Sequence, residues 1–460
     1  MERWKINLYT LWVTQVIALM SFGFGLPFLP FYIQELGIVD PAQISFYTGL
    51  ASTIPAATMV ISAPIWGLMA DRYGRKLMLM RAMFAAIFII GAMGLVTNIG
   101  QLLVLRALQG IFTGTITASM AFVSANTPET KMSSALGFMT SSNFIGYSIG
   151  PVMGGIMAEN LGYRFCFLSG GALMIVSMLL VGFLVKEDKS TYGPRIGNNP
   201  IKEERRKVKE VETMDDETMM SSGQSIPRLS ADVEIEDKTT ASMNQKVEAD
   251  SNGSKVHNGS KVNNANFIKG AKLLTPLITM LLLLLFLNRM SRIIFTPFIP
   301  LFVQQSLNSI SGAAAYTGII NGIIGVSGAL AAVTLARLGD RYDKNRIVMI
   351  LSVLSLPLAI LLALSHSLIV FIIMFGLFSF VVGGIEPILT SSASEHTSPA
   401  KRGMLFGFLG AVGNGAFMVA PLIGVYISVN FSIHAILYAI PAFMLIQIGL
   451  IYKETKAERG

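Results

Sequence analysis

Ionisable side chains within long apolar runs are the residues of this sequence best suited to chemistry. Glu386 is the carboxylate placed deepest in such a run, while Arg289 and Arg292 lie three residues apart in another, beside Asn288. A helix would place the two arginines on one face. Burial in an apolar medium disfavours a charged carboxylate, so Glu386 could bind and release a proton near neutral pH. We expect Glu386 to pair with one of the arginines, either for proton coupling or as a permanent ion pair.

Arg106 is a third arginine in an apolar run, and it lies in the pattern Leu102-x-x-x-Arg106-x-x-Gln109-Gly110. An arginine in hydrocarbon is costly and persists where it faces protein or a wet cavity and finds partners. Because the run starts near Gly100, Arg106 lies only about two helical turns from the end of the run. Its side chain could therefore also extend to the membrane surface.

The composition indicates that these groups lie in a membrane protein. Of 460 residues, 52% are hydrophobic and 13% are charged, which is about half the charge of a soluble domain. The apolar runs are long enough to cross a bilayer, and spans of this kind must be helices because a helix satisfies its own backbone hydrogen bonds in lipid. We predict an all-α membrane protein with twelve transmembrane helices, at 8–34, 44–66, 77–97, 100–122, 134–158, 163–185, 272–303, 313–335, 347–365, 368–390, 403–428 and 432–452.

Basic residues on the connections predict the orientation of these spans. Connections after even-numbered spans carry Lys and Arg, for example Arg72, Arg75 and Lys76, whereas the alternate connections carry almost none beyond Arg164. The positive-inside rule then places both termini in the cytoplasm. We expect a multi-pass protein of the plasma or inner membrane of the cell.

The sequence also contains an internal duplication. Short motifs recur with an offset of 269 or 270 residues: Pro27-x-x-Pro30 as Pro297-x-x-Pro300, Tyr47-Thr48-Gly49 as Tyr316-Thr317-Gly318, Asp71-Arg72-Tyr73 as Asp340-Arg341-Tyr342, and Pro151 as Pro421. We therefore predict two pseudo-symmetric six-helix bundles, at 1–185 and 269–460. The polar segment 186–268 between them is predicted to be a disordered cytoplasmic linker.

Three motifs resemble those of the major facilitator superfamily. The first is Gly67-Leu-Met-Ala-Asp71-Arg72-Tyr-Gly74-Arg75-Lys76, whose degenerate second copy includes Asp340 and Arg341. The second is the pattern around Arg106, and the third is Gly146-x-x-x-Gly150-Pro151-x-x-Gly154-Gly155. Together they resemble the twelve-span drug:proton antiporters of the bacterial multidrug-efflux branch. The resemblance implies the major facilitator fold, a conformational switch formed by the first and third motifs, and a part in proton coupling for Arg106.

Aromatic and amide side chains within the spans suit an amphipathic ligand. The candidates for the substrate cavity are Gln15, Phe22, Phe28, Phe31, Tyr32, Asn143, Asn288, Asn321 and Asn414. Three deep arginines against one glutamate make the expected cavity positive, which favours neutral or anionic substrates.

Other classes of protein are disfavoured. There is no phosphate-binding lysine loop, no nucleophile–base constellation and no histidine pair for a metal, and the single Cys166 excludes an intrachain disulfide. We expect no enzyme, no cofactor and no nucleic-acid partner. The predicted function is that of a monomeric, proton-coupled transporter that uses the proton gradient to export drugs or other small amphipathic molecules by alternating access. The alternatives are an exporter or facilitator of a sugar or organic anion, and a non-transporting membrane sensor or scaffold that acts through the linker.

Overall fold

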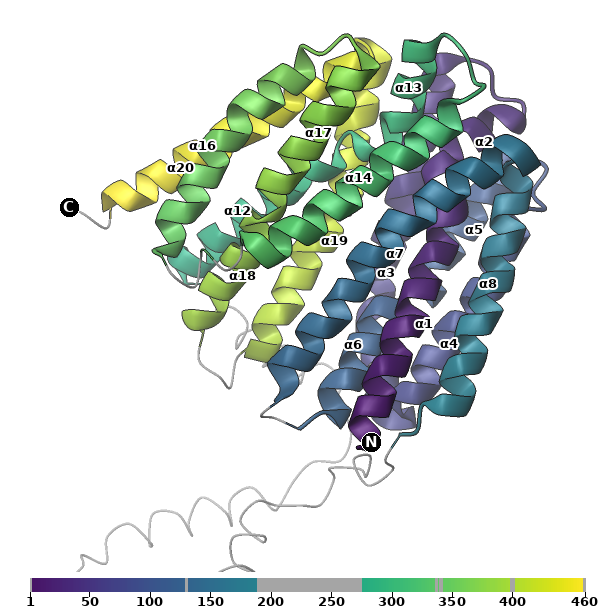
Figure 1. The fold of residues 1–460 in the computed structure, drawn as a ribbon, viewed down its shortest axis with the longest axis vertical. Coiled ribbons are helices and arrows are strands. Elements are labelled where there is room, and N and C mark those ends of the chain that lie inside the picture. Colours follow the sequence, from purple (N-terminus) through teal and green to yellow (C-terminus); the bar gives the residue numbers. More distant parts are fainter. Residues whose placement is uncertain are drawn as a thin grey trace, which may run out of the picture. The chain divides into compact units, whose positions relative to one another are not determined.

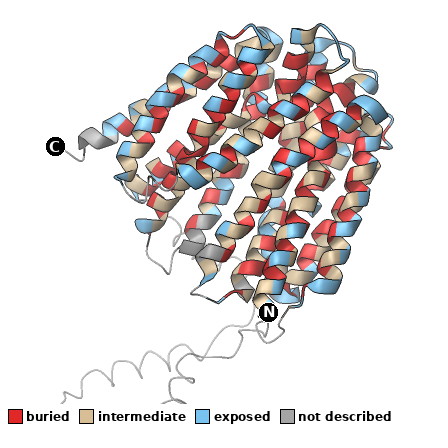
Figure 2. Cartoon of the chain, viewed as in Figure 1, coloured by how far each residue is buried: buried red, intermediate tan, exposed pale blue. Residues whose placement is uncertain are grey.

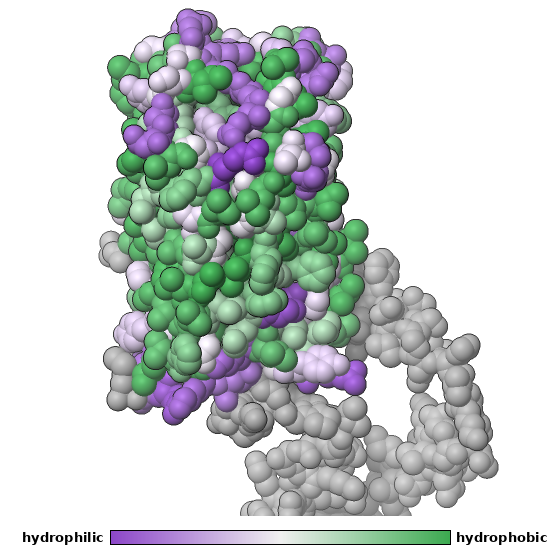
Figure 3. Space-filling model, turned by 90° about the vertical axis from the view of Figure 1, so that its right-hand side faces the viewer, coloured by the Kyte–Doolittle hydropathy of each residue, from purple (hydrophilic) through white to green (hydrophobic). Residues whose placement is uncertain are grey.

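A computed structural model of the protein describes residues 2–128, 131–187, 275–335, 338, 342–397 and 402–457. Every regular element in these residues is a helix (Figure 1). Eleven helices are long and apolar enough to cross a membrane, and the fifth predicted span is a further long helix, α7 (Met132–Leu161). Hydrophobic side chains cover the middle of the molecular face, and most hydrophilic ones gather toward its two ends (Figure 3). The chain is therefore an all-α, multi-pass membrane protein.

The helices of the first half are α1 (Arg3–Gly25), α2 (Leu29–Glu35), α3 (Pro41–Tyr73), α4 (Arg75–Met93), α5 (Ile99–Phe112), α6 (Thr115–Asn126), α7 and α8 (Tyr163–Leu184). Those of the second half are α12 (Pro276–Ile293), α13 (Ile299–Leu307), α14 (Ala313–Thr334), α16 (Lys344–Ala363), α17 (Leu368–Gly383), α18 (Ile385–Glu395), α19 (Arg402–Asn430) and α20 (Ala439–Ala457). We call the end at which α8 ends and α12 begins the linker end, and the opposite end the distal end. Most of the predicted linker, 188–274, lies outside the described residues.

Repeated prolines interrupt the first helix of each half at the same place. A 3₁₀ turn, Leu26–Phe28, separates α1 from α2, and another, Thr296–Phe298, separates α12 from α13. Each turn contains the first proline of a Pro-x-x-Pro repeat, and proline cannot donate the helical hydrogen bond. Spans 1 and 7, predicted as continuous, are thus each broken near the distal end.

Spans 4 and 10 are also broken, again at equivalent positions. Span 4 is divided into α5 and α6 at Gly114, whose φ of 123° suits glycine, and span 10 is divided into α17 and α18 at Gly384. The two glycines are 270 residues apart, which is the offset of the sequence repeat. The duplication predicted from short motifs therefore extends to the helix breaks.

The two halves meet along α7 with α14 and along α3 with α19. Glycines of the repeated Tyr-Thr-Gly motif allow the close approach: a Cβ on Gly318 would collide with the carbonyl oxygen of Pro151, and a Cβ on Gly49 would come within 3.2 Å of that of Pro421. The repeated glycines thus pack against the repeated prolines of the other half. Buried residues follow the faces where helices meet (Figure 2).

Candidate functional site

Glu386 lies at the break in span 10. It occupies the first turn of α18, which begins directly after Gly384, and Pro387 follows it. A proline is tolerated in the first turn because the backbone N–H groups there have no helical partner. The same free N–H groups give the start of a helix a partial positive charge, which favours an anionic side chain. The break therefore places a carboxylate at a polar helix end inside the membrane-spanning region, as discontinuous transporter helices do.

Two arginines of α12 hold this carboxylate. Arg289 donates to Oε1 of Glu386 from Nε at 3.1 Å and from Nη2 at 2.5 Å, and Arg292 donates from Nη1 to Oε2 at 3.2 Å. About a quarter of each side chain is exposed: 24%, 28% and 27% for Arg289, Arg292 and Glu386. We call these three residues the Arg–Glu cluster. Glu386 pairs with both arginines rather than with one, and the cluster carries a net charge of +1.

Glycines on neighbouring helices make room for the cluster. A Cβ on Gly413 of α19 would overlap the guanidinium of Arg289, and a Cβ on Gly328 of α14 would lie 3.8 Å from Nη2 of Arg292 and 3.4 Å from the ring of Phe144. Phe144 belongs to α7, in the first half. Four helices of the second half therefore surround the cluster, and one side of it faces the first half.

Arg106 lies in the first half, and its partners are local. It is 7% exposed, and its Nε donates to the carbonyl oxygen of Ala51 at 2.7 Å, while Nη1 donates to Oε1 of Gln109 at 2.5 Å. The Ala51 carbonyl lacks its helical donor because Pro55, four residues later in α3, has no N–H. A backbone gap in α3 thus explains how an arginine is accommodated in span 4. Within the described residues, no hydrogen bond or ion pair joins Arg106 to the Arg–Glu cluster.

The loop of the first motif is held by residues of the predicted linker. Gly74 adopts a φ of 100°, and Glu187 accepts hydrogen bonds from the backbone N–H groups of Arg75 (2.8 Å) and Lys76 (3.1 Å) at the start of α4. Lys76 Nζ donates to the carbonyl oxygen of Val185 at 2.6 Å. Lys186 pairs through its backbone with the side chain of Asn7.

No pattern in the sequence marks Glu187 or Asn7 as a partner of the first motif or of the linker. The predicted linker begins at 186, whereas Lys186 and Glu187 are hydrogen-bonded to Asn7 and Arg75 of the first half. Glu187 lies just after a predicted helix and 112 residues beyond Arg75, so no local pattern in the sequence marks this contact.

The other described residues of the first motif make fewer contacts with the rest of the protein. A glycine at position 67 permits close helix contact, but the described structure places no atom within 4 Å of a Cβ built on it, so no such contact forms in this conformation. Arg72 lies over the ring of Tyr73. The side chain of Asp71, and both Asp340 and Arg341, lie outside the described residues.

The third motif packs α7 on both sides. Gly146, Gly150 and Gly154 face α1, where a Cβ would meet Leu19, Met20 and Phe24 respectively. Gly155 faces the second half instead, where a Cβ would lie 2.6 Å from the carbonyl oxygen of Ala314. Both helix contacts depend on the absence of side chains, as expected for closely spaced membrane helices.

The predicted cavity residues fall into three groups. Gln15 and Asn288 are buried and Asn143 is partly buried, and each has a buried side-chain atom without a hydrogen-bond partner among the described residues. Partly buried residues are Phe22, Asn321, whose Nδ2 donates to the carbonyl oxygen of Thr317, and Asn414. Phe28, Phe31 and Tyr32 are at most 2% exposed, and Tyr32 donates to the carbonyl oxygen of Met93. These three aromatics pack within the protein and offer no surface to a ligand in this conformation, which corrects their assignment to the cavity.

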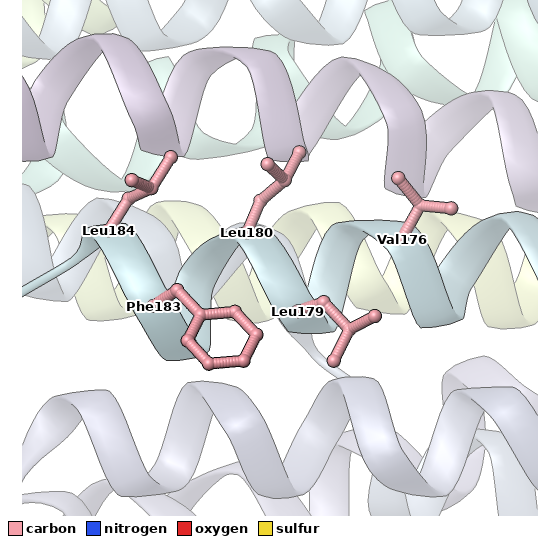
Figure 4. Close-up of a pocket in the computed structure, with 5 residues that line it drawn as sticks. All are labelled: Val176, Leu179, Leu180, Phe183 and Leu184. Atoms are coloured by element: carbon pink, nitrogen blue, oxygen red, sulfur yellow. The ribbon is translucent and has the colours of Figure 1, made fainter.

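An apolar pocket on α8 does not qualify as a site. Its volume is about 270 Å³, and it is lined by Val176, Leu179, Leu180, Phe183 and Leu184 (Figure 4). These side chains are hydrocarbons without a nitrogen, oxygen or sulfur atom, so they can neither bind a polar group nor transfer a proton. The described residues also contain no group of three His, Cys, Asp or Glu side chains that could hold a metal ion.

Comparison with known proteins agrees with this architecture. The family model of the Major Facilitator Superfamily matches residues 11–223 and 281–460. The chain is 28% identical over 445 residues to the multi-drug resistance efflux pump PmrA homolog of Lactococcus lactis subsp. lactis (strain IL1403), covering 97% of this chain and 94% of that protein. It is 25% identical to the multidrug resistance protein MdtG of Proteus mirabilis (strain HI4320), covering 95% and 92%.

Solved structures show the same fold at lower identity. The human organic anion transporter MFSD10 (TETRAN) matches with a TM-score of 0.64 at 16% identity, over 98% of this chain and 100% of that one. A bacterial homolog of the human lysosomal transporter Spinster, in an inward-facing and unoccupied conformation, matches with a TM-score of 0.66 at 13% identity, over 99% and 97%. The chain therefore belongs to the Major Facilitator Superfamily and is a membrane transporter.

Proposed function

We propose that the protein is a proton-coupled exporter of small amphipathic molecules, drugs among them, that works by alternating access without a cofactor. The observation that carries this proposal is the Arg–Glu cluster. It places a partly exposed carboxylate at a helix break, between two cations and facing the other half. The names of the efflux pumps related to this chain support the same direction of transport.

The seam between the halves supports a cavity open toward the linker end. Near the distal end the halves touch closely, as at Gly155 and Ala314. Toward the linker end the described contact is looser, because a Cβ on Gly410 of α19 would meet nothing within 4 Å. The basic loops of the linker end place that end, with both termini, in the cytoplasm by the positive-inside rule. We infer that this is the conformation that takes up substrate from the cytoplasmic side of the cell membrane.

Glu386 can couple substrate and proton because its environment contains opposing influences. Burial in a membrane protein favours the protonated carboxyl, while two guanidinium groups and a helix start favour the carboxylate. Small changes in access or in the position of the arginines would therefore change its protonation. Protonation would weaken the bonds to Arg289 and Arg292, free their donors and alter the packing of α12 against α18. The halves would then rock about the glycine–proline contacts of the seam.

The net charge of the cluster bears on the substrate. One uncompensated positive charge within a membrane protein is costly, and a bound anion would compensate it. This observation favours neutral or anionic substrates and supports a second candidate function, an exporter or facilitator of an organic anion or sugar. A strong preference for lipophilic cations would contradict the proposed role of the cluster.

Proton release from the purified protein tests the proposal directly. The protein in detergent with a pH-sensitive dye is given, in turn, an amphipathic cationic dye, an organic anion and a sugar. Wild type should release protons with at least one of them, and Glu386→Gln should release none. Glu395 lies on α18 as Glu386 does, but it is exposed and pairs with Lys344 of α16, so Glu395→Gln should behave as wild type. Antiport would be refuted by the absence of proton release, together with no transport driven by a pH gradient in inverted vesicles.

A further inference from the structure

A reciprocal pair of amide side chains joins the two halves at the distal end. Gln34 Nε2 donates to Oε1 of Gln304 at 2.9 Å, and Gln304 Nε2 donates to Oε1 of Gln34 at 3.1 Å. Gln34 lies on α2, and Gln304 lies on α13, the equivalent short helix of the second half. Both side chains are partly buried. Each amide thus uses the other as both donor and acceptor.

The two glutamines are 270 residues apart, which is the offset of the internal repeat. A residue that contacts its own repeat equivalent lies at the pseudo-two-fold axis between the bundles, where any rocking of the halves changes the contact directly. A cavity of about 380 Å³ adjoins the pair and includes Gln305 and Asn308 among its polar residues. Water or solute from the distal side could therefore reach the pair once it separates.

Two other hydrogen bonds join the halves, one deeper between α3 and α19 and one at the exposed distal ends of α7 and α14, and we call these contacts the closed seam. Thr53 of α3 donates to the carbonyl oxygen of Met418 of α19 at 3.1 Å and is 7% exposed. Glu159 of α7 accepts a hydrogen bond from the backbone N–H of Gly312, directly before α14. These contacts lie on either side of the axis, whereas the glutamine pair lies on it.

We propose that Gln34 and Gln304 are positioning residues that form the external latch of the transport pathway. This inference rests on the proposed alternating-access function and its orientation. In the conformation with the linker end open, the reciprocal amide bonds hold the distal ends of α2 and α13 together. Opening to the outside requires both bonds to break, after which each amide bonds water in the adjoining cavity. The strength of the pair then sets how often the transporter faces outward.

Thiol labelling from outside tests the latch without any substrate. Thr53→Cys places a reporter in the closed seam, and the chain's own Cys166 is fully buried and remains unreactive in the folded protein. Right-side-out vesicles are exposed to a membrane-impermeant maleimide. Adding Gln34→Glu and Gln304→Glu replaces two hydrogen bonds by repulsion between like charges, and the reporter should be labelled about tenfold faster or more.

Two further variants separate the latch from a general loss of structure. Combining Gln34→Glu with Gln304→Lys restores attraction across the axis and should return labelling to the slow wild-type rate. Combining Gln43→Glu with Gln305→Glu adds the same two charges at the distal end but outside the pair, and it should also label slowly.

The labelling results test the latch separately from the proposed transport function. Fast labelling only in the double-glutamate variant supports it. Equal labelling in all variants overturns it, as does fast labelling that the glutamate–lysine variant fails to reverse. Failure of proton-driven transport in the wild type would instead refute the proposed function. The labelling result would then still show whether the glutamine pair holds the distal end closed.

Discussion

Replacing Gly413 by alanine should separate Arg289 from Glu386. A Cβ at position 413 would overlap the Arg289 guanidinium, so the side chain or α19 must move. Gly410 offers a matched control, because it lies one turn earlier on the same helix and a Cβ there would meet nothing within 4 Å. Both substitutions change the same helix in the same way, and only one of them disturbs the cluster.

The expected magnitude follows from the contacts of Arg289. It supplies two of the three hydrogen bonds to Glu386. Hydrogen bonds to charged groups contribute about 1.5–3 kcal/mol each, and we take the lower value because about a quarter of each side chain is exposed. Losing both costs about 3 kcal/mol, while alanine in a helix gains about 1 kcal/mol over glycine. Gly413→Ala should therefore be destabilised by about 2 kcal/mol and Gly410→Ala stabilised by about 1 kcal/mol.

The single cysteine provides the assay. Cys166 is fully buried, so a thiol-reactive fluorophore reports unfolding of the detergent-solubilised protein as temperature rises. Gly413→Ala should unfold at a lower temperature than wild type and should lose transport driven by a pH gradient, whereas Gly410→Ala should unfold slightly higher and keep its transport. If the two variants had the same unfolding temperature and the same transport rate, the close contact of α19 with Arg289 would be wrong.

Three further predictions follow from other parts of the chain. Pro55→Ala restores a backbone N–H that competes with Arg106 for the carbonyl oxygen of Ala51, so proton-driven transport should fall. Pro64→Ala in the same helix should have a smaller effect, and equal transport rates in the two variants would contradict this role of the free carbonyl. Gly318→Val adds a side chain where the two halves touch, so transport in vesicles should be lost although the protein still folds; normal flux would show that the halves do not need this close approach. Deleting residues 190–265 should leave the flux of a transporter unchanged, and a loss of output that depends on this segment would favour a sensor.

The sequence by itself determined the membrane class, the positions of the spans and the duplication. These properties are local or periodic: a long apolar run predicts a helix in lipid wherever the rest of the chain lies, and the constant offset of Pro-x-x-Pro and Tyr-Thr-Gly relates the halves without any coordinates. The spacing of Arg289 and Arg292 likewise placed them on one helix face. The family resemblance followed from contiguous motifs for the same reason.

Only the tertiary structure decided which partners these residues have. Glu386 bonds both arginines because a break at Gly384 orients the start of α18 toward α12. Arg106 bonds a carbonyl left free by a proline on another helix, and Glu187 bonds a loop that precedes it by more than a hundred residues. Hydropathy and spacing describe one segment at a time, whereas these contacts depend on how closely separate helices pack and on which backbone groups each break leaves without a partner.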